Sequence, residues 1–543
     1  MNFDYVIIGA GSAGCLLANR LSESGKHQVC LVEAGPSDWS PFIHIPAGFL
    51  KTVTNKKVNW LYDTEPSWGT NGRAIPTPRG KVIGGSSSIN GLIFSRGQKL
   101  DFDTWAQLGN IGWGYADLLP HFRNLETYIP GRNTLLESDS TNLFRGTNGE
   151  MLVTDLMWRD PLCDAFIKAA QSMGMPLNND YNGENQEGVS YVQRTSTNRR
   201  RMSSAQAYLK PARKRKNLHV IKNAFVTSIL LENKKAVGVT FKKGGPANAE
   251  LRIKANREVI ISGGAVNSPQ LLQVSGIGSS DLLLSLGVGV KHELIGVGEN
   301  LQDHYATRLT GRVKNVRTIN ELSRGPRLFG EFIKYFCGQQ SILSLGPTLV
   351  YCFWHSDEAM RNNDLQISFT PASYSLGRQS ELDREPGFSI ATWVQRPQSV
   401  GWVRARSKNP FDKPLIQPNY LSSHLDQQIL VKGIKIARML MNSAPLKPYF
   451  DHEVYPGREV QSDEDLLTVA RERSNTAYHL VGTCRMGPKT DPSAVVDSKL
   501  KVHGLQNLRV VDASIMPTIP SANVNAAVLA IAEKAASEIL GDL

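Results

Sequence analysis

Three glycines near the N-terminus are spaced for phosphate binding. Gly9, Gly11 and Gly14 form a G-x-G-x-x-G pattern. In this pattern the first glycine permits a tight turn, the second lets the backbone approach a pyrophosphate, and the third lets a helix pack closely on a strand. Glu33 follows Gly14 by 19 residues, close to the roughly 20 expected for an acid that binds a ribose hydroxyl. Together these residues predict a dinucleotide site, although the glycines alone would also fit a turn that serves packing.

The elements that must position these glycines can be read from the flanking sequence. An apolar strand, Tyr5–Ile8, leads into the glycines, and a helical stretch, Cys15–Ser22, follows them. A second apolar run, Val29–Glu33, ends in the acid. Strand, turn and helix in this order place the helix N-terminus, with its unpaired N–H groups and positive dipole, against the phosphates.

Composition indicates a soluble globular protein. The chain has 543 residues, of which 41% are hydrophobic and 20% charged, and it contains no apolar run of 18 residues that would predict a membrane-spanning helix. The first predicted strand leaves no room for a signal peptide. We expect reduced, buried thiols in an intracellular protein, because the cysteines show no metal-binding spacing. They are Cys15, Cys30, Cys163, Cys337, Cys352 and Cys484.

The chain is basic, with a formal net charge of +12. Its basic runs, 199–201 and 213–216, lack interleaved aromatic residues and belong to no recognised nucleic-acid module. We therefore expect no nucleic-acid partner and interpret the runs as a solvated basic face. Weak attraction to acidic partners or to an anionic membrane remains open. The expected location is the cytoplasm, with peripheral contact at the cytoplasmic face of the membrane as the alternative.

A second glycine-rich segment carries a resemblance to a known family. Arg79–Gly91 reads RGKVIGGSSSING and resembles the first signature of the glucose–methanol–choline oxidoreductases, flavoproteins that oxidise alcohols. Three further segments match the same family, in the same order as in its members: 264–278, 297–304 and 511–517. Among the branches of this family, the chain looks most similar to the bacterial choline-dehydrogenase-like enzymes, which include alcohol dehydrogenases.

The resemblance implies FAD as the cofactor. It assigns Gly9, Gly11, Ser12, Ala13 and Gly14 to the pyrophosphate, Glu33 and Ala34 to the adenosine ribose, Val226 to the adenine, Val82, Gly85, Asn90, Gly91 and Ile93 to the flavin, and Asp512 and Ala513 to the ribityl chain. Some members attach the flavin covalently through a histidine immediately before the asparagine of the first signature. Here that position is Ile89, so FAD is expected to bind non-covalently.

The same resemblance identifies two residues for alcohol oxidation. His479 lies in YHLVGTCRMG, which is similar to the family's catalytic loop, although Leu480 stands where the family usually has proline. Imidazole, with a pKa of about 6.5, suits the removal of a hydroxyl proton near neutral pH. The second position, histidine or asparagine in the family, corresponds to Asn523, which would hold the substrate oxygen. Asn525 is the weaker candidate and would cap the last helix or contact the cofactor.

The predicted fold is α/β (α+β overall), with a Rossmann-like FAD-binding domain built from separated segments. An inserted substrate-binding domain would contain an antiparallel sheet and helices. Strands are expected at 218–221, 225–231, 237–241, 258–263 and 507–512, and long helices at 425–441 and 526–540. The FAD-binding segments are predicted as 1–155, 215–310 and 465–543, and the substrate segments as 156–214 and 311–464.

The predicted reaction is oxidation of a primary alcohol to an aldehyde, with a quinone or dye favoured over oxygen as the electron acceptor. An oxygen-using oxidase, a non-redox FAD lyase or photodecarboxylase, a nicotinamide dehydrogenase and a flavin-fold binding protein without turnover are the alternatives. Choline is not favoured, because no aromatic–carboxylate box for a quaternary ammonium is evident. The aromatic residues Phe353, Trp354 and Trp393 and the segment 397–401 are candidates for the pocket wall, and equally for the core.

Overall fold

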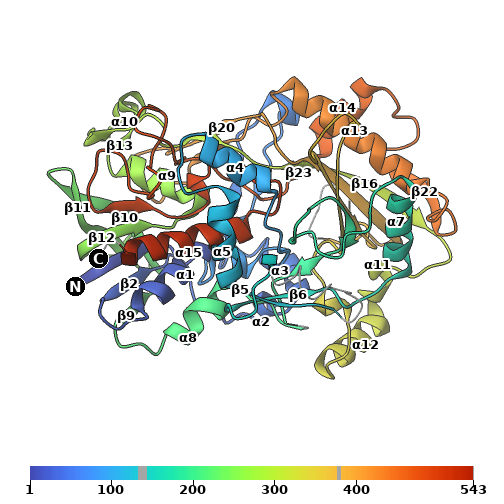
Figure 1. The fold of residues 1–543 in the computed structure, drawn as a ribbon, viewed down its shortest axis with the longest axis horizontal. Coiled ribbons are helices and arrows are strands. Elements are labelled where there is room, and N and C mark those ends of the chain that lie inside the picture. The colour runs from blue at the N-terminus through green and yellow to red at the C-terminus, as the bar shows by residue number, and fades with distance from the viewer. Residues whose placement is uncertain (132–142, 198, 376–380, 542–543) are drawn as a thin grey trace.

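The structure is a computed structural model that describes residues 1–131, 143–197, 199–375 and 381–541. Within these residues the chain forms a mixed α/β fold of two lobes, each built on a seven-stranded sheet. Figure 1 shows both chain termini in one lobe, so this lobe combines the beginning and the end of the sequence. The predicted α/β class, with one sheet of Rossmann type and one antiparallel sheet, is confirmed.

The first sheet is the nucleotide-binding sheet. Its strand order is β10-β11-β12-β1-β2-β9, and β24 also pairs with β12. The strands β24, β12, β1, β2 and β9 run parallel, whereas β10 and β11 pair antiparallel beside β12. The strands are β1 (Asn2–Ile8), β2 (Val29–Val32), β9 (Leu218–Ile221), β10 (Ala224–Glu232), β11 (Lys235–Lys243), β12 (Glu250–Ile261) and β24 (Leu508–Val510).

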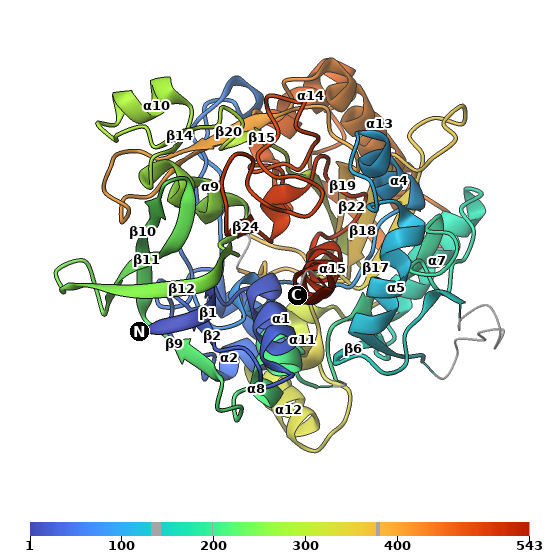
Figure 2. The ribbon, with the colours of Figure 1, turned by 60° about the vertical axis from the view of Figure 1, so that its left-hand side comes forward.

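The first and last long helices pack together beside this sheet. They are α1 (Ser12–Ser22) and α15 (Asn525–Gly541), and α5 (Tyr115–Leu125) packs on the other flank of α15. Figure 2 shows α1 and α15 side by side in front of the sheet. The two helices therefore bring the glycine turn and the C-terminal segment to one edge of the sheet.

The second sheet is antiparallel, with the order β22-β16-β19-β18-β17-β7, and β23 also pairs with β16. Two helices, α13 (His424–Met441) and α7 (Pro161–Ser172), pack against it. Its strands are β7 (Gly188–Tyr191), β16 (Tyr305–Val313), β17 (Val350–Trp354), β18 (Leu365–Thr370), β19 (Gly387–Val394), β22 (Phe450–Tyr455) and β23 (Asn475–Thr476).

Shorter elements connect the two lobes and complete their surfaces. Before residue 160 they are α2 (Pro41–His44), η1 (Pro46–Gly48), α3 (Phe49–Thr52), β3 (Tyr62–Asp63), η2 (Trp68–Thr70), β4 (Pro76–Thr77), η3 (Gly85–Ser88), α4 (Lys99–Gln107), β5 (Glu126–Ile129) and β6 (Met151–Asp155). After it they are β8 (Gln193–Arg194), η4 (Ala205–Leu209), α8 (Lys210–Ala212), α9 (Gly264–Val274), β13 (Ile277–Gly278), α10 (Ser280–Ser285), β14 (His292–Glu293), β15 (Glu299–Leu301), α11 (Ile319–Leu322), α12 (Gly325–Phe336), η5 (Ile342–Ser344), β20 (Gly401–Arg404), β21 (Leu415–Gln417), α14 (Asp463–Arg473) and η6 (Ala513–Ile515).

Several element boundaries differ from the sequence prediction. The first helix begins at Ser12 rather than Cys15, so one more turn faces the glycines. The strand predicted at 258–263 begins at Glu250 and ends before Ser262, because its polar outer half pairs with β11 on the nucleotide-binding sheet. The predicted helices at 425–441 and 526–540 each agree with the structure within one residue at each end.

The two segments predicted to form the substrate-binding domain, 156–214 and 311–464, contribute elements to both lobes. The elements η4 and α8 lie in the segment 156–214, yet they pack on α1, and Asn19 donates a hydrogen bond to the carbonyl of Tyr208 (2.7 Å). Strand β20, from the segment 311–464, pairs with β15 on one side and with β21 on the other, and it packs against α9. Strand β7, from the segment 156–214, pairs with β17 in the second sheet.

The expectation that all the cysteine thiols are buried is wrong at one position. Five of the six cysteines are buried, but Cys337, directly after α12, is exposed. Among the described residues, no helix is both long enough and apolar enough to cross a membrane.

The glycine turn is held by close backbone contacts. Gly9 has a φ of +96°, which side-chain-bearing residues rarely adopt. A Cβ on Gly14 would lie 1.9 Å from the carbonyl oxygen of Gly9, and a Cβ on Gly85 would lie 2.6 Å from the Cα of Gly11. Both neighbours are backbone atoms of the same turn. Glycine is therefore required where helix α1, strand β1 and the second glycine-rich segment meet.

Replacing Gly14 tests this packing. Gly14→Ala should lower the free energy of unfolding by about 1–3 kcal/mol, because the added methyl group meets backbone that cannot rotate away. Gly289→Ala is the matched control, since a Cβ there meets no atom within 4 Å. Thermal unfolding of both variants measures the difference. Equal melting temperatures would show that the close contact is not required.

Candidate active site

A cavity of about 990 Å³ lies between the two sheets and is lined by residues from both lobes. One wall contains the last residues of the parallel strands, Ile8, Val32 and Ile261. The carboxyl ends of parallel strands are where nucleotide sites form in doubly wound folds. The other wall is the face of the second sheet that points away from α13. The cavity can therefore receive a nucleotide along the first wall and a small molecule along the second.

Most of the residues predicted to bind the cofactor line this cavity. They are Gly9, Gly11, Ser12, Ala13, Glu33, Ala34, Gly85, Asn90, Gly91, Ile93, Val226, Asp512 and Ala513. Two predicted residues do not. Gly14 lies behind the turn, where its role is close packing. Val82 is fully buried in a small apolar cluster with Ile89, so its side chain is not part of the wall.

Glu33 is fixed by backbone donors at the nucleotide end. Its carboxylate accepts hydrogen bonds from the N–H groups of Ala10 (2.8 Å) and Gly35 (2.7 Å). Burial raises the pKa of Glu33 to about 7, and these two donors oppose the rise. The acid predicted to bind a ribose is thus held at the cavity wall by the turn that follows β1 and by the chain that follows β2.

Asp512 fixes a second backbone segment. One carboxylate oxygen accepts hydrogen bonds from the Gly264 N–H (2.8 Å) and the Ser268 hydroxyl (2.5 Å). The other accepts from the N–H (2.8 Å) and the hydroxyl (2.6 Å) of Ser514. Burial raises the pKa of Asp512, while these donors lower it. Asp512 thereby joins the start of α9 to the segment after β24 at the cavity wall.

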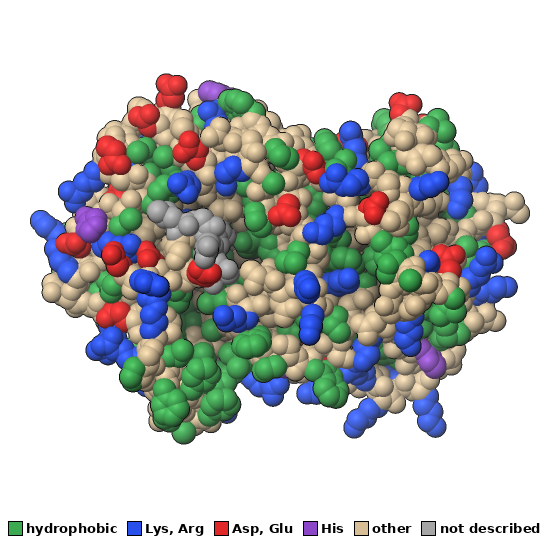
Figure 3. All heavy atoms as spheres, turned by 180° about the vertical axis from the view of Figure 1, so that it is seen from behind, with side chains coloured by type: hydrophobic (Ala, Val, Ile, Leu, Met, Phe, Trp, Pro, Cys, Tyr) green, Lys and Arg blue, Asp and Glu red, His purple; other side chains and the backbone are tan. Residues whose placement is uncertain are grey.

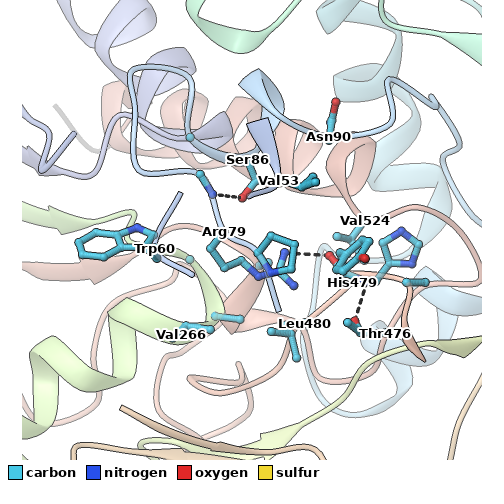
Figure 4. Close-up of a pocket in the computed structure, with 18 of the residues that line it drawn as sticks. Val53, Trp60, Arg79, Ser86, Asn90, Val266, Thr476, His479, Leu480 and Val524 are labelled. Atoms are coloured by element: carbon cyan, nitrogen blue, oxygen red, sulfur yellow. Dashed lines mark hydrogen bonds between the residues drawn. The ribbon is translucent and has the colours of Figure 1, made fainter. Parts of the chain in front are cut away.

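The donors that remain unpaired fit FAD. Arg79 gives one hydrogen bond, from Nη1 to the carbonyl of Tyr478 (2.8 Å), while its Nε and Nη2 are buried without a partner among the described residues. The hydroxyl of Ser262, beside Gly9, is likewise buried and unpaired. Figure 4 shows Arg79 between Trp60 and His479 along the cavity. A polar, anionic cofactor passing over the glycines would meet these groups, and Ile89 offers no nucleophile for a covalent link.

The loop that carries His479 is held by a buried carboxylate. Asp303 accepts hydrogen bonds from the His479 N–H (2.7 Å), from the Tyr420 hydroxyl (2.5 Å) and from the Thr476 hydroxyl. Tyr478, immediately before the histidine, has a φ of +68°, a strained conformation for a residue with a side chain. The Asp303 contacts hold the loop in this conformation, so the position of the imidazole is fixed before any ligand binds.

Hydrogen bonds on both sides of His479 determine which ring nitrogen carries the proton. His304 Nε2 lies 2.8 Å from the carbonyl of Gln395, and a carbonyl only accepts, so Nε2 of His304 is protonated. His304 Nδ1 lies 2.9 Å from Nδ1 of His479. Burial lowers the pKa of His304 to about 4, so its Nδ1 is an acceptor and Nδ1 of His479 donates. The Nε2 lone pair of His479 faces Asn523, whose Nδ2 is 2.9 Å away.

The environment keeps His479 neutral. Burial, the neighbouring His304 and the Arg79 cation lower the pKa of His479 well below its usual value of 6.5. The sequence prediction placed this pKa near the working pH, because imidazole in water titrates there. The structure corrects that value, since desolvation disfavours the charged imidazolium. A neutral imidazole with a lone pair on Nε2 can accept a proton from a group placed beside it.

The substrate end of the cavity is built from alternate residues of the second sheet. Ala306, Arg308 and Thr310 of β16 line it, as do Ala391 and Trp393 of β19. This spacing of two places one face of the sheet on the cavity and the other on the helices. Of the aromatic residues predicted for the wall, only Trp393 lines it. Phe353 is buried in the core of this lobe and Trp354 is partly buried against it, and the segment 397–401 contributes no lining residue.

Positive charge dominates this end. The charged lining residues here are Arg73, Arg79, Arg308, Arg473 and Glu472. The guanidinium of Arg308 lies over the ring of Tyr374, 4.7 Å from its centroid, so this aromatic face already has a cation. The described part of the wall therefore favours a neutral or anionic small molecule over a cationic one.

Sequence reasoning missed several residues that shape the site. Asp303 and His304 lie in the segment 297–304, which was used for the family resemblance without a role for either side chain. Arg79 begins the second glycine-rich segment, but no role was predicted for its side chain. The signal was present in each motif, but the contact between His304 and His479 joins positions 175 residues apart. No local pattern reports such a contact.

Comparisons with known proteins identify the family of this chain. The family model described as GMC oxidoreductase matches residues 3–306 with its N-terminal part and 397–532 with its C-terminal part. An oxygen-dependent choline dehydrogenase of Photobacterium profundum is 39% identical over 547 residues, covering 99% of this chain and 93% of the relative. An alcohol dehydrogenase (acceptor) of Pseudomonas putida is 39% identical over 539 residues, covering 99% and 96%.

A solved structure extends the agreement to three dimensions. Pyridoxine 4-oxidase from Mesorbium loti superposes with a TM-score of 0.88 at 30% sequence identity, over 99% of each chain. Family matches cover most of the sequence, and the residues that would hold the cofactor line one cavity. The chain therefore belongs to the GMC oxidoreductase family and is an FAD-dependent oxidoreductase.

Proposed function

We propose that this protein oxidises an uncharged primary alcohol to the aldehyde, with FAD bound non-covalently. The observation that carries the proposal is the neutral imidazole of His479, whose Nε2 lone pair meets the amide of Asn523 at the cavity. Both positions that the family uses for chemistry are therefore filled by groups in the state that alcohol oxidation requires. A binding protein without turnover would have no need for this arrangement.

The chain supplies the proton chemistry and the orientation. A substrate hydroxyl placed between His479 and Asn523 would donate its proton to Nε2 of His479, while Nδ2 of Asn523 donates to the substrate oxygen. His304 holds the protonated ring in place by accepting from Nδ1 of His479. When bound, FAD supplies the acceptor for the hydride that leaves the carbinol carbon. The alcohol thus loses one proton and one hydride and becomes the aldehyde.

Removing either polar group should slow the reduction of bound FAD by substrate. His479→Ala should lower this rate about 10²- to 10⁴-fold, the usual contribution of a positioned base. Asn523→Ala should lower it about 10²- to 10³-fold, because the charge that develops on the oxygen loses its donor. Anaerobic stopped-flow bleaching at the flavin absorption band measures both. His452→Ala, which removes an exposed imidazole, is the matched control, and unchanged bleaching in His479→Ala would refute the assigned role.

The pH dependence should follow the lowered pKa of His479. Because the neutral imidazole is the reactive form, the rate should be lost only on the acid side, at a pH well below 6.5. Arg79→Gln removes a cation that lowers this pKa, so the acid limb should move to higher pH. The exposed Arg200→Gln should leave it unchanged. Anaerobic reduction rates across pH give the profile, and an acid limb at or above 6.5 in the unmodified enzyme would contradict the predicted neutrality.

The charge of the cavity leads to a prediction about substrate choice. Choline and 3,3-dimethylbutan-1-ol have the same shape, but only choline carries a positive charge. The arginines that line the substrate end should make the neutral alcohol the better substrate, with a kcat/KM at least about tenfold higher. Arg308→Gln should lower the ratio of kcat/KM for the neutral alcohol to kcat/KM for choline, since it removes one of these cations. A preference for choline would contradict this proposal and would indicate the activity for which the choline dehydrogenase relatives are named.

We propose a quinone or another non-oxygen compound as the electron acceptor. Support comes from the relative named alcohol dehydrogenase (acceptor) and from the basic net charge of +12, which suits approach to an anionic membrane that holds quinones. An alcohol oxidase that uses oxygen is the alternative, and a lyase that keeps FAD without reducing it is the other. Oxygen uptake and quinone reduction with one alcohol separate the first two, and bleaching of the flavin by alcohol in the dark excludes the lyase.

A further inference from the structure

Helix α12 turns its apolar face outward. The spacing of Phe329, Phe332, Ile333 and Phe336 places these side chains on one stripe of the helix, and they are 68%, 39%, 51% and 71% exposed. Surface helices usually turn such a stripe toward the core. Figure 3 shows hydrophobic side chains gathered at the lower left, where α12 protrudes from the molecule.

The opposite face explains why the helix is held in this orientation. Glu331 and Tyr335 are its buried residues. One carboxylate oxygen of Glu331 accepts a hydrogen bond from the Ile342 N–H (2.9 Å), and the Tyr335 hydroxyl donates to the carbonyl of Arg199 (2.8 Å). These polar contacts anchor the helix through its polar face. The apolar stripe is therefore presented to the surroundings by specific bonds rather than by fraying of the chain.

Positive charge surrounds the stripe. Residues 199–200 and 321–340 together contain five arginines or lysines and two glutamates. Arg199 donates to the carbonyls of Tyr335 and Phe336 at the C-terminus of the helix (3.2 and 3.5 Å), and Arg200 beside it is exposed. Basic residues next to an apolar stripe are the pattern of helices that lie in the interface of an anionic membrane. In a symmetric pair of copies the same basic rim would face itself, which is unfavourable.

We propose that α12 docks this protein on a bilayer containing anionic phospholipid, with the phenylalanine stripe in the acyl boundary and the basic rim on the headgroups. The helix packs on η5, and η5 packs on η1. The chain continues from these elements to Pro347 and Val53, which line the cavity. A docked α12 therefore lies one packing layer from a wall of the cavity. The proposal does not depend on the substrate or the electron acceptor, because it concerns the partition of the folded protein between water and the bilayer.

Vesicle flotation of the holoenzyme tests the docking. The unmodified protein should float with vesicles of phosphatidylcholine and phosphatidylglycerol, and much less with phosphatidylcholine alone. Phe329→Ser with Phe336→Ser should lower the partition coefficient at least about tenfold, since two large apolar groups lose their burial. Ile111→Ser with Leu284→Ser is the matched control. It removes two apolar side chains that are 87% and 66% exposed elsewhere, and it should float like the unmodified protein.

A probe at the native exposed thiol provides a second readout. Cys337 follows the helix directly and is the exposed cysteine, the other five being buried, so a polarity-sensitive fluorophore attaches there without mutagenesis. Its emission should shift to shorter wavelength on anionic vesicles and return in high salt. FAD content and dye-linked turnover of a soluble alcohol serve as folding controls for each variant.

Three results would overturn the proposal. The first is equal flotation of the Phe329/Phe336 variant and the unmodified protein. The second is the absence of flotation on anionic vesicles. The third is a dimer in sedimentation that the same two substitutions convert to monomer, which would assign the stripe to a second copy of the chain.

Discussion

The proposed chemistry depends on a buried imidazole that cannot easily accept a charge before substrate arrives. His479 lies out of water beside a second neutral imidazole and a cation, so its neutral state is maintained by desolvation. The carbonyl of Gln395 fixes the proton of His304, and His304 in turn fixes the proton of His479. One backbone oxygen in the second lobe thereby decides which nitrogen of His479 faces Asn523.

The two lobes contribute different physical requirements to this site. The nucleotide-binding sheet supplies close backbone approach, through glycines where a methyl group would collide with the chain. The antiparallel sheet supplies a wall whose alternate residues can vary in size and charge without disturbing the helices behind it. Such a division allows one family to keep a cofactor site while the substrate wall changes. In this chain the wall is rich in arginine, and the proposed preference for a neutral alcohol over choline rests on this electrostatic feature.

The sequence predicted the elements with strong local signals. The glycine turn, the strands around it and the helices at 425–441 and 526–540 follow from short-range sterics and periodicity, and their positions agree closely with the structure. Local signals are not enough where a neighbour in space decides a residue's surroundings. Val82 is next to the second glycine pair, yet its side chain is buried in a small apolar cluster and does not line the cavity. Phe353 and Trp354 were candidates for the wall and equally for the core, and packing decides for the core at Phe353.

The sequence by itself determined the family and the cofactor and predicted the two polar groups, because ordered motifs record contacts with a ligand that all members share. The tertiary structure alone decided the protonation of His479, the wall that the substrate meets and the outward face of α12. Each of these depends on burial or on partners far away in the chain, and the cost of removing a charge from water exists only once the chain has folded around it.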